Sequence, residues 1–142
     1  MTNPSSNIDP ATIQAYRETH FCVENDPPIT LQVGQKNDAL AALHRDEGVE
    51  SSAFITAWNP YSKRCSNEDN DKRQDVLSHE LRQLGLKYVD GLGQHPTDQW
   101  GEPSFLVLGI SLEAAMALGE RYEQNAIVWC GVEAVPELVL LR

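Results

Sequence analysis

Four polar residues near the middle of the chain have the types needed to bind an anion. Asn59 follows an apolar segment, and Asn67, Asn70 and Arg73 come soon after it. Arg73 would supply a positive charge, and the asparagine amides would direct hydrogen bonds to a phosphate or a carboxylate. These residues predict a site for a small anionic ligand.

The elements expected around these residues explain why they could meet. Residues 52–58 are apolar and rich in β-formers, which predicts a buried strand, and Asn59-Pro60 would end it. A helix over residues 67–84 would follow, capped by Ser66 or by Asn67 itself. Strand ends in open α/β sheets and helix N-termini are both common places for an anion.

The apolar side of this helix becomes polar toward its N-terminus. Leu77, Leu81 and Leu84 form a ridge, and extending the ridge backward brings in Arg73 and Asn70. The more ordinary interpretation is that Asn59 caps a turn, that Asn67 caps the helix, and that Asn70 and Arg73 are solvated, because caps and surface charges are far commoner than sites. Acidic residues in the first turn of the helix also weigh against an anion.

Two further candidates for chemistry are weaker. Cys65 lies beside Lys63 and Arg64 near a helix start, where the pKa of a thiol can fall, but no histidine is close in sequence. The long loop over residues 91–101 offers His95, Asp98 and Glu102, which match no metal-binding motif, so no metal site is predicted. We expect this loop to be a hairpin connection that packs Trp100, and we expect His44 to be solvated.

Composition restricts the classes of partner. The 142 residues, 41% of them hydrophobic, predict one domain over residues 9–142 after a flexible N-terminus at 1–8. The net charge of −10 disfavours duplex nucleic acid and suits a basic protein partner. Three cysteines without metal-type spacing favour a reducing cytoplasm. No apolar run is long enough to predict a membrane span, and the N-terminal residues do not resemble a signal peptide.

The order of predicted elements gives the fold class. A helix from Asp9, a strand over 29–33 and a helix over 36–46 precede the strand at 52–58. From there the order is strand, helix, strand, strand, helix, strand, strand. This predicts an α/β (α+β) sandwich with helices packed on a mixed, largely antiparallel sheet, and a ferredoxin-like core is one candidate topology.

Several segments together resemble a known family. They are Ala53–Pro60, Asn67 and Asn70, Glu102–Gly109 and Gln124–Trp129. In combination they are similar to a bacterial family called domain of unknown function 3293, and the likeness covers about the last two-thirds of the chain. The resemblance implies a small bacterial, cytoplasmic protein. It names no catalytic residue, and the cofactor stays unknown.

The same segments contain a second polar group. Glu102 and Ser104 precede one buried strand, and Gln124 and Asn125 precede another. If both strands start at the same end of the sheet, the four side chains could form one cluster with Glu102 as its general base. The alternative is a simple turn at Gln124-Asn125 with Glu102 exposed.

Two classes of function follow. We favour a binding or protein-interaction module, because no catalytic constellation is complete. The alternative is an enzyme or ligand-binding protein with an anion or phosphate site where the strand at 52–58 meets the helix at 67–84.

Overall fold

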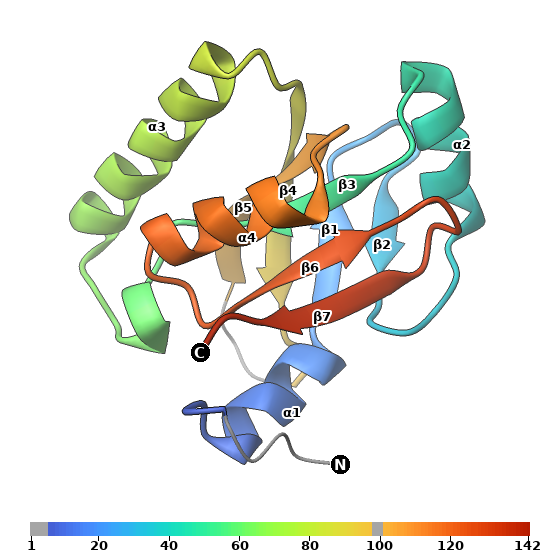
Figure 1. Cartoon of the computed structure of the whole chain (residues 1–142). Helices are drawn as coiled ribbons and strands as arrows, with labels where there is room; N and C mark the ends of the chain where they lie inside the picture. Colours follow the sequence, from blue (N-terminus) through green and yellow to red (C-terminus); the bar gives the residue numbers. More distant parts are fainter. Residues whose placement is uncertain (1–5, 98–100) are drawn as a thin grey trace.

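The structure is a computed structural model that describes residues 6–97 and 101–142. Within these residues the helices are α1 (Pro10–Glu18), α2 (Asp38–Glu47), the short 3-10 helix η1 (Pro60–Ser62), α3 (Asn67–Gln83) and α4 (Leu112–Arg121) (Figure 1). The strands are β1 (His20–Val23), β2 (Ile29–Leu31), β3 (Ser52–Ile55), β4 (Tyr88–Gln94), β5 (Gly101–Leu108), β6 (Ala126–Cys130) and β7 (Pro136–Leu140). Asp98 and Trp100 of the predicted loop, and most of the predicted flexible N-terminus, lie outside the described residues.

Side-chain caps set the starts of three helices, and the sequence predicts the starts at Asp9 and Ser66. Asp9 accepts a hydrogen bond from the backbone N–H of Ala11 at the start of α1. The hydroxyl of Ser66 accepts from the backbone N–H of Asp69 at the start of α3, and that of Ser111 accepts from the backbone N–H of Ala114 at the start of α4. Each cap satisfies a backbone donor that the first helical turn leaves without a partner.

The seven strands form one antiparallel sheet in the order β2-β1-β4-β5-β3-β6-β7. The segment β3-α3-β4-β5-α4-β6 supplies the four neighbouring strands β4-β5-β3-β6. A split βαβ unit of this order is the ferredoxin-like core. The predicted α+β class is therefore confirmed, and every pairing between described strands is antiparallel rather than mixed.

Alternation along β3 divides the core into two apolar clusters on the two faces of the sheet. Ala53 and Ile55 pack with Leu77 and Leu81 of α3 and with residues of α4. Phe54 points to the other face, into the cluster that includes residues of β1, β2 and α2. All four residues of β3 are buried, as expected for a strand covered on both faces.

Three predictions about these elements are wrong. The strand predicted over 52–58 ends at Ile55, because the N–H of Ala57 donates to Gln74 Oε1 instead of continuing the ladder with β5. Leu84 is 56% exposed, because the helix ends at Gln83 and Leu84 is only its cap. His44 is buried rather than solvated, and its Nε2 lies 2.8 Å from the hydroxyl of Ser52.

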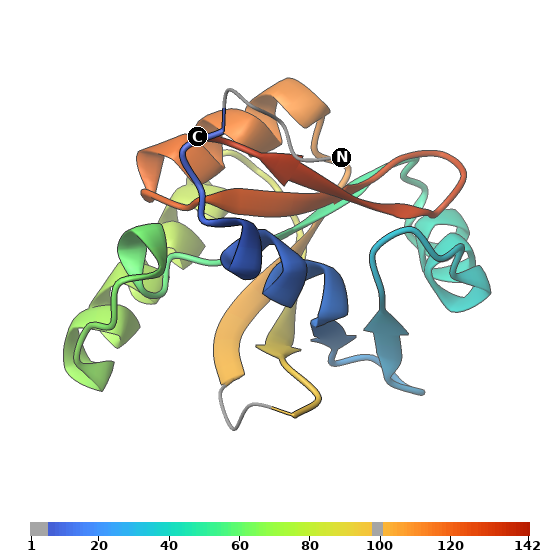
Figure 2. The ribbon, with the colours of Figure 1, turned by 90° about the horizontal axis from the view of Figure 1, so that it is seen from below.

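Helix α1 lies against the sheet apart from α3 and α4. In Figure 2, α1 is on the opposite side of β6 and β7 from α4. Ile8 and Ile13 are buried on this side, and the hydroxyl of Ser6 donates to the carbonyl of Arg142 at 2.9 Å. None of the described helices has the length and apolar character needed to cross a membrane.

Candidate functional site

Where β3 ends, side chains form hydrogen bonds with backbone groups that no longer pair within the sheet. The Gln74 Oε1 atom accepts from the N–H of Ala57 at 2.9 Å. The Thr56 hydroxyl donates to the carbonyl of Pro103 at 2.7 Å. These two bonds satisfy the N–H of Ala57 and the carbonyl of Pro103 and fix the path of the loop that follows. Among the described residues, Trp58 Nε1 and Gln74 Nε2 are buried here without a hydrogen-bond partner.

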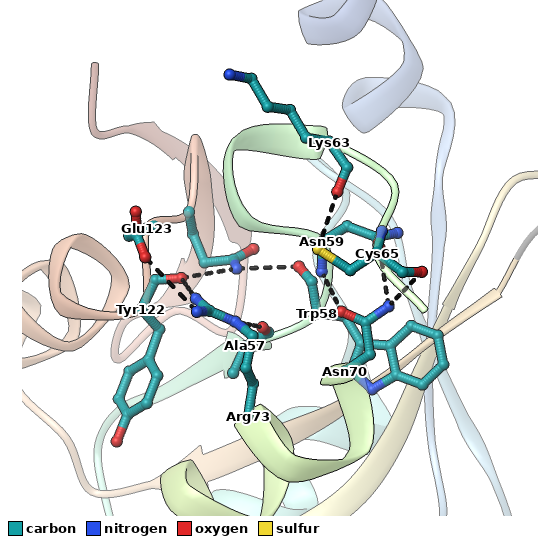
Figure 3. Close-up of polar contacts among 10 residues, drawn as sticks. Ala57, Trp58, Asn59, Lys63, Cys65, Asn70, Arg73, Tyr122 and Glu123 are labelled. Atoms are coloured by element: carbon teal, nitrogen blue, oxygen red, sulfur yellow. Dashed lines mark hydrogen bonds and ion pairs between the residues drawn. The ribbon is translucent and has the colours of Figure 1, made fainter. Parts of the chain in front are cut away.

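Asn59 and Asn70 hold the next part of this loop (Figure 3). The backbone N–H of Asn59 donates to Asn70 Oδ1 at 2.9 Å, and Asn70 Nδ2 donates to Asn59 Oδ1 at 2.8 Å. The backbone N–H of Cys65 also donates to Asn59 Oδ1. Asn70 is 1% exposed, so this predicted site residue faces inward and fixes the position of Asn59.

Arg73 lies near these two asparagines but makes different contacts. Its Nε donates to the carbonyl of Ala57 at 2.8 Å, and its Nη2 donates to the carbonyl of Tyr122 at 2.6 Å (Figure 3). Its Nη1 is 3.5 Å from a carboxylate oxygen of Glu123. These contacts join the loop after β3 to the end of α4. An anion site centred on Arg73 stays a prediction, and Asn67 is an exposed residue of the first turn of α3.

The loop after β3 has an unusual backbone. Asn59, Tyr61 and Ser62 have φ values of 46°, 53° and 62°, in the left-handed region. Non-glycine residues seldom adopt this conformation, and each instance costs about 1–3 kcal/mol. The backbone N–H of Tyr61 is held by the carbonyl of Glu123. Such strain persists only where surrounding contacts determine the conformation, and it is common at functional sites.

A cluster of hydroxyl and amide groups connects this loop to α1. The hydroxyls of Tyr16 and Ser62 are 2.6 Å apart. Asn125 Nδ2 donates to both of them, at 3.2 Å and 3.0 Å. The Oδ1 atom of Asn125 accepts from Arg142, whose guanidinium also lies over the ring of Tyr61. Asn125 is thus a predicted site residue that holds α1 against the loop.

Between α1 and this loop is a cleft of about 540 Å³. Its walls include Tyr16, Asn59, Ser62, Cys65 and Glu102. Asn67, Asn70 and Arg64 also line it. We call this space the outer cleft.

An inner cavity of about 60 Å³ adjoins the outer cleft. Tyr16, Asn59, Ser62 and Glu102 line both spaces, so they mark the boundary between them. Beyond these four residues the walls of the inner cavity are mainly apolar, with contributions from Phe21, Phe54, Ala126, Val128 and Leu138. An apolar pocket with a few polar groups at its mouth is the usual form of a small-molecule site.

Glu102 is the acidic group at this boundary. Its Oε2 atom accepts a hydrogen bond from Asn59 Nδ2 at 3.2 Å. Burial raises the pKa of Glu102 to about 7, and the hydrogen bond from Asn59 opposes part of this rise. A carboxyl group with such a pKa can both give and take a proton near neutral pH.

Two other predicted residues lie on the same cavity. Ser104 is 3% exposed, and its hydroxyl donates to the carbonyl of Glu102. Gln124 donates from Nε2 to the carbonyls of Trp58 and Tyr122. Because β5 and β6 both pair antiparallel with β3, they start at the same end of the sheet. The structure therefore places Glu102, Ser104 and Gln124 around one cavity.

Several lining residues did not emerge from the sequence. Tyr16 and Ser62 are 46 residues apart, and only the fold brings their hydroxyls together. Phe21 and Phe54 belong to the apolar core pattern, which gives no sign of a cavity beside them. One available signal was the position of Tyr16 on the thin apolar stripe of α1, because a buried tyrosine hydroxyl usually has a polar partner.

The weaker candidates have other surroundings. Cys65 is half-buried in the wall of the outer cleft, and its thiol lies 3.7 Å from the carbonyl of Lys63. His95 Nε2 lies 3.2 Å from a carboxylate oxygen of Glu18 on α1. Within the described part of the chain, no group of three metal-binding side chains comes together.

Comparison with protein families assigns this chain to a family. The family described as "Protein of unknown function (DUF3293)" matches residues 55–127, just over half of the chain, and the protein belongs to it. The match runs from the end of β3 into β6 and includes Asn59, Glu102 and Gln124. It is shorter than the two-thirds of the chain that the sequence resemblance suggested. No curated protein and no solved structure matches the chain.

Proposed function

We propose that this protein binds a small molecule whose apolar part enters the inner cavity and whose polar group lies at the boundary formed by Tyr16, Asn59, Ser62 and Glu102. The observation behind the proposal is that the two spaces share part of their lining. A cleft of about 540 Å³ and a cavity of about 60 Å³ share these four residues. The outer cleft would admit the ligand, and the apolar walls would exclude water from its buried part.

The chemistry at the boundary suits proton transfer. Asn59 Nδ2 donates a hydrogen bond to Glu102 Oε2. The other carboxylate oxygen, Oε1, would then accept a hydrogen bond from the ligand. The pKa of about 7 allows Glu102 to act as a general base in its ionised form and as a general acid in its protonated form. The hydroxyls of Tyr16 and Ser62 would orient a polar group beside it. If the protein is an enzyme, Glu102 would be its catalytic residue and would transfer a proton to or from the bound ligand.

A fragment panel observed by NMR tests the proposal. Small molecules that combine an apolar group with an amine, alcohol, amide or carboxylate would be added to ¹⁵N-labelled protein. We expect some of them to shift the amide signals of Gly93, Ser104 and Ala126, which line the inner cavity. The variant Ala126→Leu fills the cavity and should abolish these shifts. The matched control Ala117→Leu adds the same atoms to an exposed position on α4 and should preserve them.

Two outcomes would contradict the proposal. One is that no fragment shifts the signals of the cavity residues. The other is that Ala126→Leu binds fragments as well as the unchanged protein does, which would place the binding elsewhere.

The net charge of −10 favours a second candidate, an acidic module that binds a basic protein partner in the cytoplasm. The three free cysteines support such a reducing compartment. Affinity capture at low salt, repeated at high salt, tests this candidate. We expect a basic protein that is captured well above background and released by salt, and no such protein would count against it.

A further inference from the structure

The charged groups around the proposed site are few. Among the described lining residues of the two spaces, those with ionisable side chains are Tyr16, Arg64, Cys65 and Glu102. Glu102 is the carboxylate at the boundary, and Arg64 is an exposed residue of the outer cleft alone. The polar end of the inner cavity therefore carries negative charge when Glu102 is ionised.

Glu102 has no cationic partner in the described part of the chain. None of the ion pairs formed within the described residues, 6–97 together with 101–142, includes Glu102. Its polar contact is the neutral amide of Asn59. An ionised carboxylate accepts about four hydrogen bonds, and a buried one is stabilised best by a nearby positive charge. A ligand that brings a cation to this position would supply what the protein itself does not.

The inner cavity limits the size of the group beside this cation. Its volume is about 60 Å³, and one water-sized group occupies about 12 Å³. The cavity thus has room for about four or five such groups. The edge-to-face pair of Phe21 and Phe54, with ring centroids 5.1 Å apart, contributes to its wall. A short aliphatic chain or a small ring fits these dimensions and this chemistry.

We propose that the ligand of this site is a primary amine, with its ammonium group against Glu102 and a short apolar chain or small ring in the inner cavity. This inference rests on the proposed function and names the chemical class of the ligand. The ammonium would donate to Glu102 and to the hydroxyl oxygens of Ser62 and Tyr16, which are 2.6 Å apart at the boundary. A carboxylate ligand would instead meet an ionised carboxylate of the same sign.

The ionisation of Glu102 gives the inference a pH signature. The pKa of about 7 means that about a tenth of Glu102 is ionised at pH 6 and about nine-tenths at pH 8. An alkylammonium ion stays protonated throughout this range. Its affinity should therefore rise about tenfold from pH 6 to pH 8. Tyr16, Arg64 and Cys65 are the other ionisable groups of the lining, and Glu102→Gln separates their effects from that of Glu102.

The experiment compares three probes of equal length by NMR titration: n-butylammonium, n-butanol and butyrate. We expect n-butylammonium to bind at least tenfold more tightly than the other two at pH 8. In Glu102→Gln this preference should disappear, whereas the control Glu120→Gln, at an exposed position of α4, should keep it. Methylammonium has no chain to place in the cavity, so Ala126→Leu should weaken n-butylammonium far more than methylammonium.

The outcomes separate this inference from the proposed function. If n-butanol or butyrate binds the cavity as tightly as n-butylammonium, the site is a ligand site and the amine class is wrong. If no probe and no fragment shifts the cavity signals, the proposed function itself is wrong. If Glu102→Gln does not fold, the tenfold rise in the affinity of n-butylammonium between pH 6 and pH 8 decides the matter, and a flat profile overturns the inference.

Discussion

Asn59 and Asn70 exchange two hydrogen bonds, from the backbone N–H of Asn59 to Asn70 Oδ1 and from Asn70 Nδ2 to Asn59 Oδ1. Through this pair a residue of α3 fixes the first left-handed residue of the loop. The side-chain nitrogen of Asn59, Nδ2, takes no part in this exchange and donates to Glu102. The helix therefore positions, through one intermediate residue, the acidic group at the boundary of the cavity.

Replacing Asn70 by alanine should destabilise the protein. The substitution leaves the backbone N–H and the Oδ1 of Asn59 without one partner each at a partly buried position. Such a loss costs about 1–3 kcal/mol for each buried group, so we expect a fall of about 2–4 kcal/mol in the free energy of unfolding. Urea denaturation measures it. Asn67→Ala, at an exposed position of the same helix, is the control and should change stability by about 0.5 kcal/mol or less.

Glu102 should make stability fall as pH rises. In the unfolded chain its pKa is near 4.5, and in the folded protein it is about 7. Between these values the folded state holds a proton that the unfolded state has lost, so the free energy of unfolding decreases with pH and levels off above pH 7. The full effect is at most about 3 kcal/mol.

Glu102→Gln removes this dependence, because glutamine does not ionise. Denaturation at pH 5 and pH 8 should show that the unchanged protein loses stability relative to the variant over this interval. Glu120→Gln removes an exposed carboxylate and should leave the dependence intact. A variant and parent with parallel pH profiles would show that Glu102 has an ordinary pKa.

Tyr16→Phe should loosen α1 without unfolding the sheet. The hydroxyl of Tyr16 contacts Ser62 and Asn125 and joins α1 to the loop. Losing these contacts costs about 1–2 kcal/mol locally, so amide hydrogen exchange in α1 should be about 5- to 30-fold faster. Exchange in β3 and β5 should change little. Gln14→Ala, at an exposed position of α1, is the control, and equal exchange in the two variants would show that Tyr16 does not hold the helix.

Arg73→Ala should destabilise the protein whether or not an anion is present. Two of the guanidinium nitrogens donate to the carbonyls of Ala57 and Tyr122, and hydrogen bonds of charged groups contribute about 1.5–3 kcal/mol each. We expect a loss of about 2–4 kcal/mol, measured by denaturation. Lys72→Ala, in an exposed ion pair with Glu68, should cost about 0–1 kcal/mol. If phosphate stabilised the protein and lost this effect in Arg73→Ala, the anion site predicted from the sequence would regain support.

Local chemistry explains which parts of the fold the sequence predicts correctly. The caps at Asp9 and Ser66 depend on contacts two or three residues away, so their sequence signals are sufficient. The periodicity of α3 likewise indicates that Asn70 faces inward. The same periodicity fails at Leu84, because periodicity does not show at which residue a helix ends.

The candidate site depends on contacts between distant segments. Glu102 and Ser104 are recognisable as polar residues before an apolar strand, and their shared cavity with Gln124 follows from the strand order. Tyr16 on α1 and Phe21 on β1 both lie outside the matched family segment. His44 illustrates the same limit, since only the packing of α2 brings it to Ser52. No local pattern encodes these contacts.

The most direct test of the ligand site is a crystal structure of the protein soaked with the fragment panel. The predicted result is electron density for a fragment with its apolar part beside Phe54 and Ala126 and its polar group within hydrogen-bond distance of Glu102 or Asn59. Fragments bound only at other surfaces, with the inner cavity filled by neighbouring side chains, would contradict the proposal that this cavity is the functional site.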